Sequence, residues 1–168
     1  MTTPAREAPR TDLPTGEVTF LFTDIEGSTL LSQTMGDGFA EVIDRHHRIL
    51  RAVITDAGGI VVSTEGDAFF AVFTDPAKAV AAAAAGQRQL AHEHWPQDVE
   101  VRVRMGLHTG LGRLGGDDYA GVEVNRASRI SSAGHGGQVL LSDSTVEAVA
   151  GELPGGFGLR HLGAIMLK

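Results

Sequence analysis

The chain has 168 residues, 42% of them hydrophobic and 21% charged, which fits one compact globular domain. The absence of cysteine excludes disulfides and thiolate metal ligands and fits the reducing cytoplasm, where we expect the protein to act. A formal net charge of −7 argues against general nucleic-acid binding, and the longest apolar run, residues 79–85, is too short to span a bilayer. We therefore expect neither nucleic acid nor a membrane as a partner.

The N-terminal part begins with an irregular stretch. Residues 1–16 contain scattered prolines and charges without periodicity, which predicts a flexible arm ahead of a single domain of residues 17–168. Residues 18–24 are rich in β-branched and aromatic types and predict a buried strand. A helix is expected to follow from Ser28.

That helix is expected to be interrupted at residues 36–38 and to end at Gly58-Gly59. Two short strands come next, at residues 60–62 and 68–73, and the short connection between them predicts a hairpin.

The second half of the chain alternates helices and strands. Pro76 favours the start of an Ala-rich helix over residues 75–92, and strict alternation predicts a half-buried strand over residues 99–105. The remaining elements expected are a Gly/Asp-rich loop at 110–118, a helix at 121–132 and a strand at 138–141.

The C-terminal residues predict a short helix capped by Asp143 or Ser144. The last apolar run, residues 163–168, stops without a turn or partner strand, so we expect an incomplete closing hairpin. The element order is β-α-β-β-α-β followed by α-β. It predicts an α+β fold with a ferredoxin-like βαββαβ core, its crossover helices on one face, and an additional C-terminal α/β segment.

Asp24 lies where the first strand ends and a Gly-Ser-Thr turn leads into a helix. Backbone N–H groups and hydroxyls in such a turn can bind an anion. An isolated Asp at a strand end more often only caps the turn, so that alternative stays open.

The hairpin connection contains Glu65, Gly66 and Asp67. A sheet with the first strand beside this hairpin would bring Asp67 close to Asp24. Two carboxylates there would repel each other unless they were protonated or bridged by cations, and oxygen ligands suit Mg²⁺ or Mn²⁺. The alternative is a plain surface turn, since Gly-Asp is common in turns, and we expect Glu65 to be solvated.

Asn125 and Arg129 are four residues apart and share one face of the helix expected at 121–132. An amide and a guanidinium on one face suit ribose and phosphate. Apolar residues on the other side are free to bury, namely Val124, Ala127 and Ile130. Periodicity alone would favour a solvated polar face.

Arg104 alternates out of the apolar face of its strand and could contact phosphate or remain a surface cation. We expect His108 to pack or to hydrogen-bond locally. No nucleophile with a paired base stands out, so covalent catalysis is disfavoured. The Walker-type and dinucleotide glycine motifs are absent as well.

Four segments together resemble the class III adenylyl/guanylyl cyclase catalytic domain of bacterial type. They are FTDIEGST at 22–29, EGD at 65–67, VRMGLHTG at 103–110 and DYAGVEVNRASR at 118–129. Each is weak alone, but their order and spacing are specific, and the similarity covers residues 18–144.

The resemblance implies a head-to-tail homodimer that converts ATP to 3′,5′-cyclic AMP and pyrophosphate. Two divalent ions, Mg²⁺ or Mn²⁺, would bind Asp24 and Asp67, with the carbonyl of Ile25 as a further ligand. The transition-state residues would be Asn125 and Arg129. The implied substrate-binding positions are Arg104 for phosphate, Ser28 and Thr29 in the triphosphate turn, and Asp118 at the base.

Ser63 departs from the family, which has an adenine-reading lysine three residues before the hairpin glycine Gly66. Serine is short and uncharged, and a lost polar contact of this kind costs ~1–3 kcal/mol. Asp118 can still accept a hydrogen bond from the adenine amino group and would repel the guanine carbonyl, so adenine stays favoured.

Two other functions are compatible with parts of this pattern. A degenerate cyclase that binds nucleotide or a partner with little turnover is favoured by Ser63 and opposed by the intact Asp24, Asp67, Asn125 and Arg129. A cyclic-dinucleotide synthase is a second alternative, and the missing GGDEF-like signature counts against it.

Overall fold

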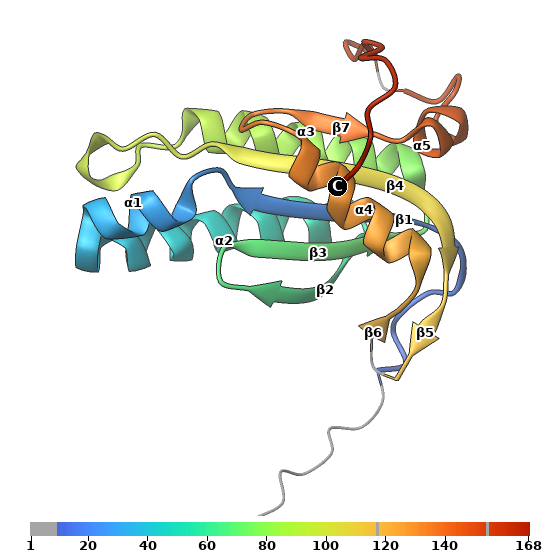
Figure 1. The fold of residues 1–168 in the computed structure, drawn as a ribbon, viewed down its shortest axis with the longest axis horizontal. Coiled ribbons are helices and arrows are strands. Elements are labelled where there is room, and N and C mark those ends of the chain that lie inside the picture. Colours follow the sequence, from blue (N-terminus) through green and yellow to red (C-terminus); the bar gives the residue numbers. More distant parts are fainter. Residues whose placement is uncertain (1–9, 117, 154) are drawn as a thin grey trace, which may run out of the picture.

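The computed structural model describes residues 10–116, 118–153 and 155–168, and its centre is a five-stranded sheet. The strands lie in the order β2-β3-β1-β4-β7 (Figure 1). Their bounds are Gly16–Ile25 for β1, Ile60–Glu65 for β2, Ala68–Phe73 for β3, Val103–Gly112 for β4 and Val139–Leu141 for β7.

The strand pairing confirms the α+β fold with a ferredoxin-like core. β1 pairs antiparallel with β3 and β4, β2 pairs antiparallel with β3, and β7 adds a parallel edge strand beside β4. The helices are α1 Ser28–Met35, α2 Phe39–Asp56, α3 Pro76–His92, α4 Val122–Ala133 and α5 Asp143–Ala148. None of them, within the described ranges, is long and apolar enough to cross a bilayer.

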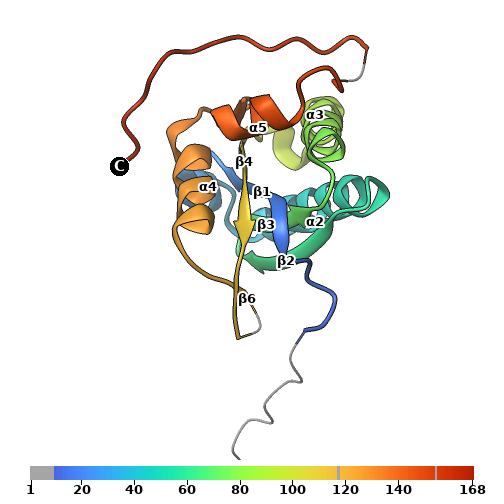
Figure 2. The same ribbon diagram turned by 90° about the vertical axis from the view of Figure 1, so that its right-hand side faces the viewer.

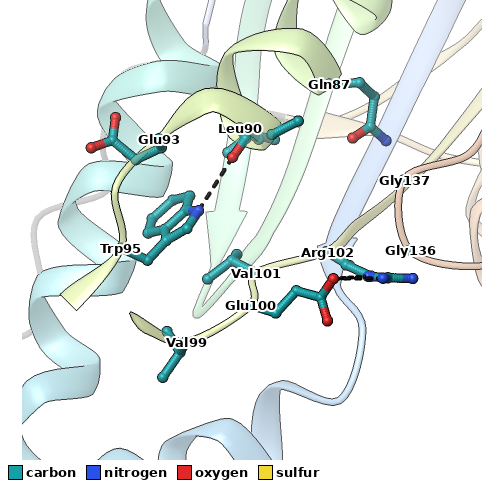
Figure 3. A pocket seen from close by; sticks show the side chains of 11 residues that line it. Gln87, Leu90, Glu93, Trp95, Val99, Glu100, Val101, Arg102, Gly136 and Gly137 are labelled. Carbon is teal, nitrogen blue, oxygen red and sulfur yellow. Dashed lines mark hydrogen bonds and ion pairs between the residues drawn. The ribbon is translucent and has the colours of Figure 1, made fainter. Parts of the chain in front are cut away.

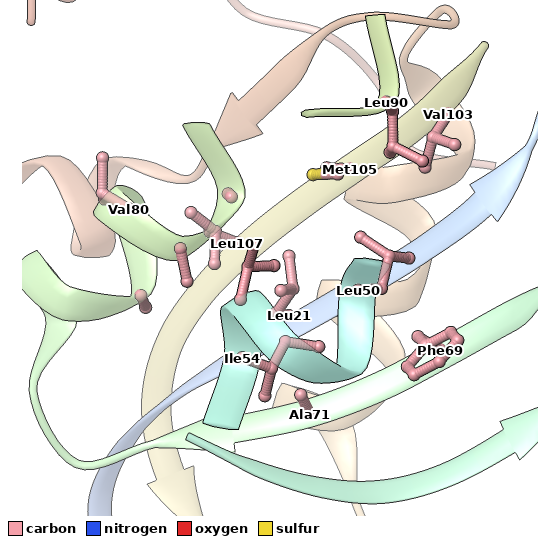
Figure 4. Close-up of a cluster of buried hydrophobic side chains, with 14 of the residues drawn as sticks. Leu21, Leu50, Ile54, Phe69, Ala71, Val80, Leu90, Val103, Met105 and Leu107 are labelled. Carbon is pink, nitrogen blue, oxygen red and sulfur yellow. The ribbon is translucent and has the colours of Figure 1, made fainter. Parts of the chain in front are cut away.

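The helices divide between the two faces of the sheet. The crossover helices α2 and α3 cover one face, as expected, whereas α4 of the C-terminal segment lies on the opposite face, against β4 and β1 (Figure 2). The α2–α3 side holds the larger hydrophobic core, where Leu21, Leu107 and Phe69 of the strands meet Leu50 and Ile54 of α2 (Figure 4). Burial of this apolar surface holds the helices on the sheet.

Glycines set the ends of the first two helices. A single 3₁₀ turn, Gly36–Gly38, separates α1 from α2 and confirms the predicted interruption. After α2, Gly58 has a φ of 82°, and the N–H of Gly59 donates to the carbonyl of Ile54 at 2.9 Å. This is a glycine-terminated helix end, as predicted.

The hairpin between β2 and β3 is tighter than the sequence predicts. β2 continues to Glu65, so that Gly66 and Asp67 alone form the turn. Gly66 has a φ of 57°, the left-handed conformation that two-residue hairpin turns require. The strand continues because β3 offers backbone partners as far as the turn.

β4 begins and ends later than local alternation predicts, because its bounds follow its pairing with β1. Val103 lies opposite Ile25 and Gly112 lies opposite Gly16, so β4 matches β1 along its whole length. Residues 99–102 alternate in the same way but form no strand.

The loop expected at 110–118 is therefore partly strand. The first residues of the expected loop, 110–112, belong to β4. A small hairpin of β5 (Leu114–Gly115) and β6 (Asp118–Tyr119) follows.

The short helix α5 is capped one residue earlier than the sequence predicts. Ser142 is its N-cap, and the Ser142 Oγ accepts a hydrogen bond from the N–H of Thr145 at 3.4 Å. Asp143, one of the two residues expected to cap, is already the first helical residue. In α4, the burial of Ala127 and Ile130 confirms the expected apolar side.

The described part of the expected N-terminal arm is packed on the domain, while residues 1–9 lie outside the described residues. Leu13 is buried against the sheet, and Arg10 donates through Nη1 to the carbonyl of Val62 at 2.8 Å. Tyr119 Oη donates to the carbonyl of Pro14. At the other end, described residues 155–168 form no helix or strand.

Candidate active site

Asp24 and Asp67 lie at the same end of neighbouring strands. The register of β1 and β3 places Thr23 opposite Phe69, so Asp24 falls at the end of β1 beside the turn that holds Asp67. The N–H of Ile25 donates to Asp67 Oδ2 at 2.6 Å and fixes that carboxylate next to the end of β1. Two carboxylates thus lie at one corner of the sheet.

Arg104 lies directly opposite Asp24 on β4 and binds it with two hydrogen bonds. Arg104 Nε is 2.7 Å from Asp24 Oδ1 and Nη2 is 2.6 Å from Oδ2. The hydrogen bond to Asp24 is the main cause that raises the pKa of Arg104, and the charges of Asp24, Glu26 and Asp67 add to it. Arg104 Nη1 also reaches the carbonyl of Ser132, at the end of α4, at 3.5 Å. This corner is therefore acidic, with one guanidinium that partly balances it.

Ser28 and Thr29 open helix α1 next to this corner. Gly27 before them has a φ of 67°, and no side chain among the described residues caps the helix. The first N–H groups of a helix have no partner inside it and carry partial positive charge. The first turn of α1 therefore offers donors to an anion, together with the half-buried Ser28 and the exposed Thr29.

Ser63 and Asp118 flank one aromatic cluster, which consists of Phe20, Phe22, Phe70 and Tyr119. Ser63 is the cross-strand partner of Phe70, and Phe70 stacks on Phe22 with ring centroids 4.4 Å apart. Tyr119 packs edge-on against Phe20 and Phe70, which carries its neighbour Asp118 over the same face of the sheet. Asp118 Oδ1 accepts a hydrogen bond from the N–H of Tyr119 at 2.6 Å.

Asn125 and Arg129 are exposed on α4. Neither forms a side-chain hydrogen bond or ion pair with any residue in the described part of the chain. The structure brings Asp24, Ile25, Asp67 and Arg104 together, but leaves Asn125 and Arg129 pointing out of the same chain.

Two polar residues near α4 pair in a way that the sequence did not indicate. His108 is 2% exposed, so it packs as expected, but it binds Glu123 of α4 and Ser142 before α5, which are distant in sequence rather than local. Glu123 was not singled out at all. The sequence feature that could have indicated this pairing is a pair of glycines, Gly106 and Gly110, which lie on either side of His108 on the same face of the strand.

A pocket between the end of α3 and residues 99–102 contains none of the predicted site residues (Figure 3). Its polar groups are already paired, because Glu100 binds Arg102 and Trp95 Nε1 donates to the carbonyl of Leu90 at 3.2 Å. Within the described ranges, no group of three or more His, Cys, Asp or Glu side chains gathers to hold a metal ion. Of the predicted metal ligands, the carboxylates of Asp24 and Asp67 lie at the same corner of the sheet.

Most of the chain is similar in sequence to adenylate and guanylate cyclase catalytic domains. The family model of the adenylate and guanylate cyclase catalytic domain matches residues 11–168. An uncharacterised Mycobacterium tuberculosis protein is 39% identical over 157 residues, which cover 92% of this chain and 53% of that protein. An adenylate cyclase of Mycosarcoma maydis is 34% identical over 165 residues, covering 83% of this chain and 7% of the fungal protein. The chain thus spans about half the length of the mycobacterial relative and a small part of the fungal one.

Solved cyclase structures have the same fold. An adenylate cyclase from Trypanosoma brucei in its monomeric state superimposes with a TM-score of 0.85 at 29% identity, covering 94% of this chain and 86% of that chain. The guanylate cyclase domain from Catenaria anguillulae in complex with GTP gives a TM-score of 0.73 at 26% identity, covering 81% of this chain and 83% of that chain. Both adenylate and guanylate cyclases are therefore among the similar proteins. On its sequence match and its fold, this chain belongs to the family of adenylate and guanylate cyclase catalytic domains.

Proposed function

We propose that this chain is an adenylyl cyclase that converts ATP to 3′,5′-cyclic AMP and pyrophosphate at sites shared between two copies. The observation that carries the proposal is the placement of Asp24 and Asp67 at one corner of the sheet, beside Arg104. Similarity to the adenylate cyclase of Mycosarcoma maydis supports it. In this reaction the ribose 3′-oxygen attacks the α-phosphorus in line and pyrophosphate leaves.

Asp24 and Asp67 are the residues that would hold two Mg²⁺ or Mn²⁺ ions, with the carbonyl of Ile25 as a further ligand. The donors fit, because they are all oxygens, and sites for Mg²⁺ often use one or two carboxylates together with substrate phosphates. When bound, such ions lower the pKa of the attacking hydroxyl and neutralise charge on the leaving triphosphate. The first turn of α1, with Ser28 and Thr29, would bind the triphosphate oxygens.

Asn125 and Arg129 would act on a substrate bound to the other copy, since both point away from their own chain. Arg129 would stabilise negative charge on the transferring phosphoryl group. Asn125 would hold the ribose in the attacking geometry. The proposed head-to-tail homodimer follows from this division of roles.

Asp118 and Ser63 would read the base, because both border the aromatic cluster on the same face of the sheet. The Asp118 carboxylate accepts from the adenine amino group and repels the guanine carbonyl. Ser63 contributes at most a short hydrogen-bonding group where a lysine would reach further. We therefore expect a preference for ATP over GTP that is modest.

The test mixes two inactive variants. Asp24→Ala removes a carboxylate, and Arg129→Ala removes the guanidinium of α4, so each variant alone should form little cyclic AMP from ATP with Mn²⁺. A mixed dimer keeps one intact site, and activity should return on mixing. Absence of rescue, with mixed dimers demonstrated by two affinity tags, would contradict the shared site. Parallel assays with GTP measure the base preference.

A degenerate cyclase with little turnover is the second candidate. Ser63 at the base position and the occupation of Asp24 by Arg104 favour it. It predicts nucleotide binding without product. An assay of product formation under saturating Mn²⁺ and ATP separates the two, because measurable turnover that Asp67→Asn abolishes excludes this candidate.

A further inference from the structure

A buried histidine connects β4 to the first turn of α4. His108 Nε2 is 2.6 Å from Glu123 Oε2, and His108 Nδ1 is 2.7 Å from Ser142 Oγ. Both ring nitrogens are bonded, so the imidazole has one orientation. With the Nε2 proton donated to Glu123 and the Ser142 hydroxyl donated to Nδ1, a neutral imidazole satisfies both bonds.

Two glycines allow α4 to lie directly on β4. A side chain at Gly106 would overlap the backbone of Ser131 on α4, and a side chain at Gly110 would overlap the carboxylate of Glu123. His108 lies between them on the same face of the strand. The helix is therefore placed by backbone contact at its end and by the His108–Glu123 bond at its start.

Glu123 precedes Asn125 by two residues and Arg129 by six on one continuous helix. A helix rises about 1.5 Å per residue, so Glu123 and Arg129 are only ~9 Å apart along the axis. A shift or rotation of the first turn of α4 therefore moves both side chains. Displacements near 1 Å at a reacting group can cost a factor of about 100 in rate.

The surroundings of Ser142, His108 and Glu123 argue against a nucleophilic role. Ser142, His108 and Glu123 resemble a serine triad in composition, but His108 is 2% exposed. Ser142 Oγ also caps α5 and lies 3.0 Å from Ser144 Oγ. That oxygen is therefore already engaged at the start of α5.

We propose that His108 and Glu123 are positioning residues that hold α4 at the depth and rotation at which Asn125 and Arg129 reach the substrate of the partner copy. This inference rests on the proposed function. Neither residue touches the substrate. Their effect on the reaction passes through α4.

The experiment starts from the mixture of the Asp24→Ala and Arg129→Ala chains. In its one intact site, the Asp24→Ala chain supplies α4 and the Arg129→Ala chain supplies the carboxylates. Glu123→Leu, which cannot accept the hydrogen bond, is added to one chain or to the other. We expect kcat to fall about tenfold or more in the first arrangement and less than about twofold in the second.

A merely structural role would lower activity equally in both arrangements, and that result would overturn the inference, as would no loss in either. Glu123→Gln keeps an oxygen that accepts from His108 Nε2 and should retain most of the activity. An inactive parent mixture would instead overturn the shared site, and with it this inference, so the two failures are distinguishable.

Gly110→Ala supplies a second, independent variant. Its new methyl group displaces the Glu123 side chain and should lower kcat alone, but should add little in a chain that carries Glu123→Ala, which removes every side-chain atom that the methyl group would meet. Additive losses from the two substitutions would contradict the His108–Glu123 link.

Discussion

In the single chain Asp24 is bound by Arg104 through two hydrogen bonds. Their side chains are only 28% and 27% exposed, so separating them without a replacement partner is costly. A guanidinium fits a phosphate as well as a carboxylate. We expect Arg104 to leave Asp24 for a substrate phosphate oxygen when nucleotide and Mn²⁺ bind. A structure of that complex with the Arg104–Asp24 pair intact would contradict this expectation.

Ser63 allows a direct test of base reading. If it occupies the position that contacts adenine, Ser63→Lys should raise kcat/KM for ATP more than for GTP, by about tenfold, which equals ~1.4 kcal/mol in transition-state binding. The physical reason is that lysine reaches the base edge, whereas serine leaves it to water. Both nucleotides are assayed under identical metal concentrations.

Thr64→Lys is the matched control for that substitution. Thr64 is the exposed neighbour of Ser63 on the same strand and pairs with Phe69, which faces the α2–α3 side. Thr64→Lys adds the same charge on the opposite face and should leave the ratio of kcat/KM for ATP to kcat/KM for GTP unchanged. Equal changes for ATP and GTP in Ser63→Lys would mean that Ser63 does not face the base.

His46 makes the stability of the fold depend on pH. It is fully buried in α2, and neither ring nitrogen has a hydrogen-bond partner among the described residues. Burial lowers the pKa of His46 from 6.5 to about 4, and the neighbouring His47 adds to this. Because the unfolded chain binds the proton more readily, the stabilisation by neutral His46 is complete above pH 6.5 and is lost as the pH falls towards 4.

We expect this group to remove about 2 kcal/mol of unfolding free energy between pH 7.5 and pH 5. Urea unfolding at both values measures it. His46→Leu should lose that part of the pH dependence, while His161→Gln, at an exposed position, should keep it. The same change in unfolding free energy between the two pH values for wild type and His46→Leu would show that His46 does not titrate with folding.

At the scale of elements, the contact between α4 and β4 depends on glycine. Gly106→Ala would drive a methyl group into the backbone of Ser131, which cannot rotate away. Overpacking of this kind costs about 1–3 kcal/mol, and we expect a lower Tm together with reduced activity. Gly155→Ala is the control, because a side chain there meets nothing within 4 Å. An unchanged Tm for Gly106→Ala would mean that α4 is not seated on β4 as described.

At the scale of the whole molecule, the proposed site needs residues from two copies of the chain. Asp24 and Asp67 lie at a corner of the sheet, whereas Asn125 and Arg129 point outward from α4. Specific activity should therefore rise with protein concentration and level off as dimers form. Activity assays over a dilution series, compared with the oligomeric state by light scattering, test this. A constant specific activity in a demonstrated monomer would exclude the shared site.

The amino-acid sequence by itself determined the features that depend on local pattern. Glycines at 36–38 and 58–59 mark helix ends, because glycine adopts conformations that other residues avoid. The apolar side of α4 could be predicted from helical spacing. Asp24 and Asp67 could be assigned to a strand end and a turn, since those positions follow from the short elements beside them.

Only the tertiary structure decided which side chains meet. The limits of β4 depend on its pairing with β1, and the Arg104–Asp24 bond joins residues 80 positions apart. The His108–Glu123 bond requires α4 to lie close enough for Gly110 to leave room. Periodicity shows which face of its own element a residue occupies. It carries no information on which other element packs there, because sheet register and helix approach are set by long-range packing.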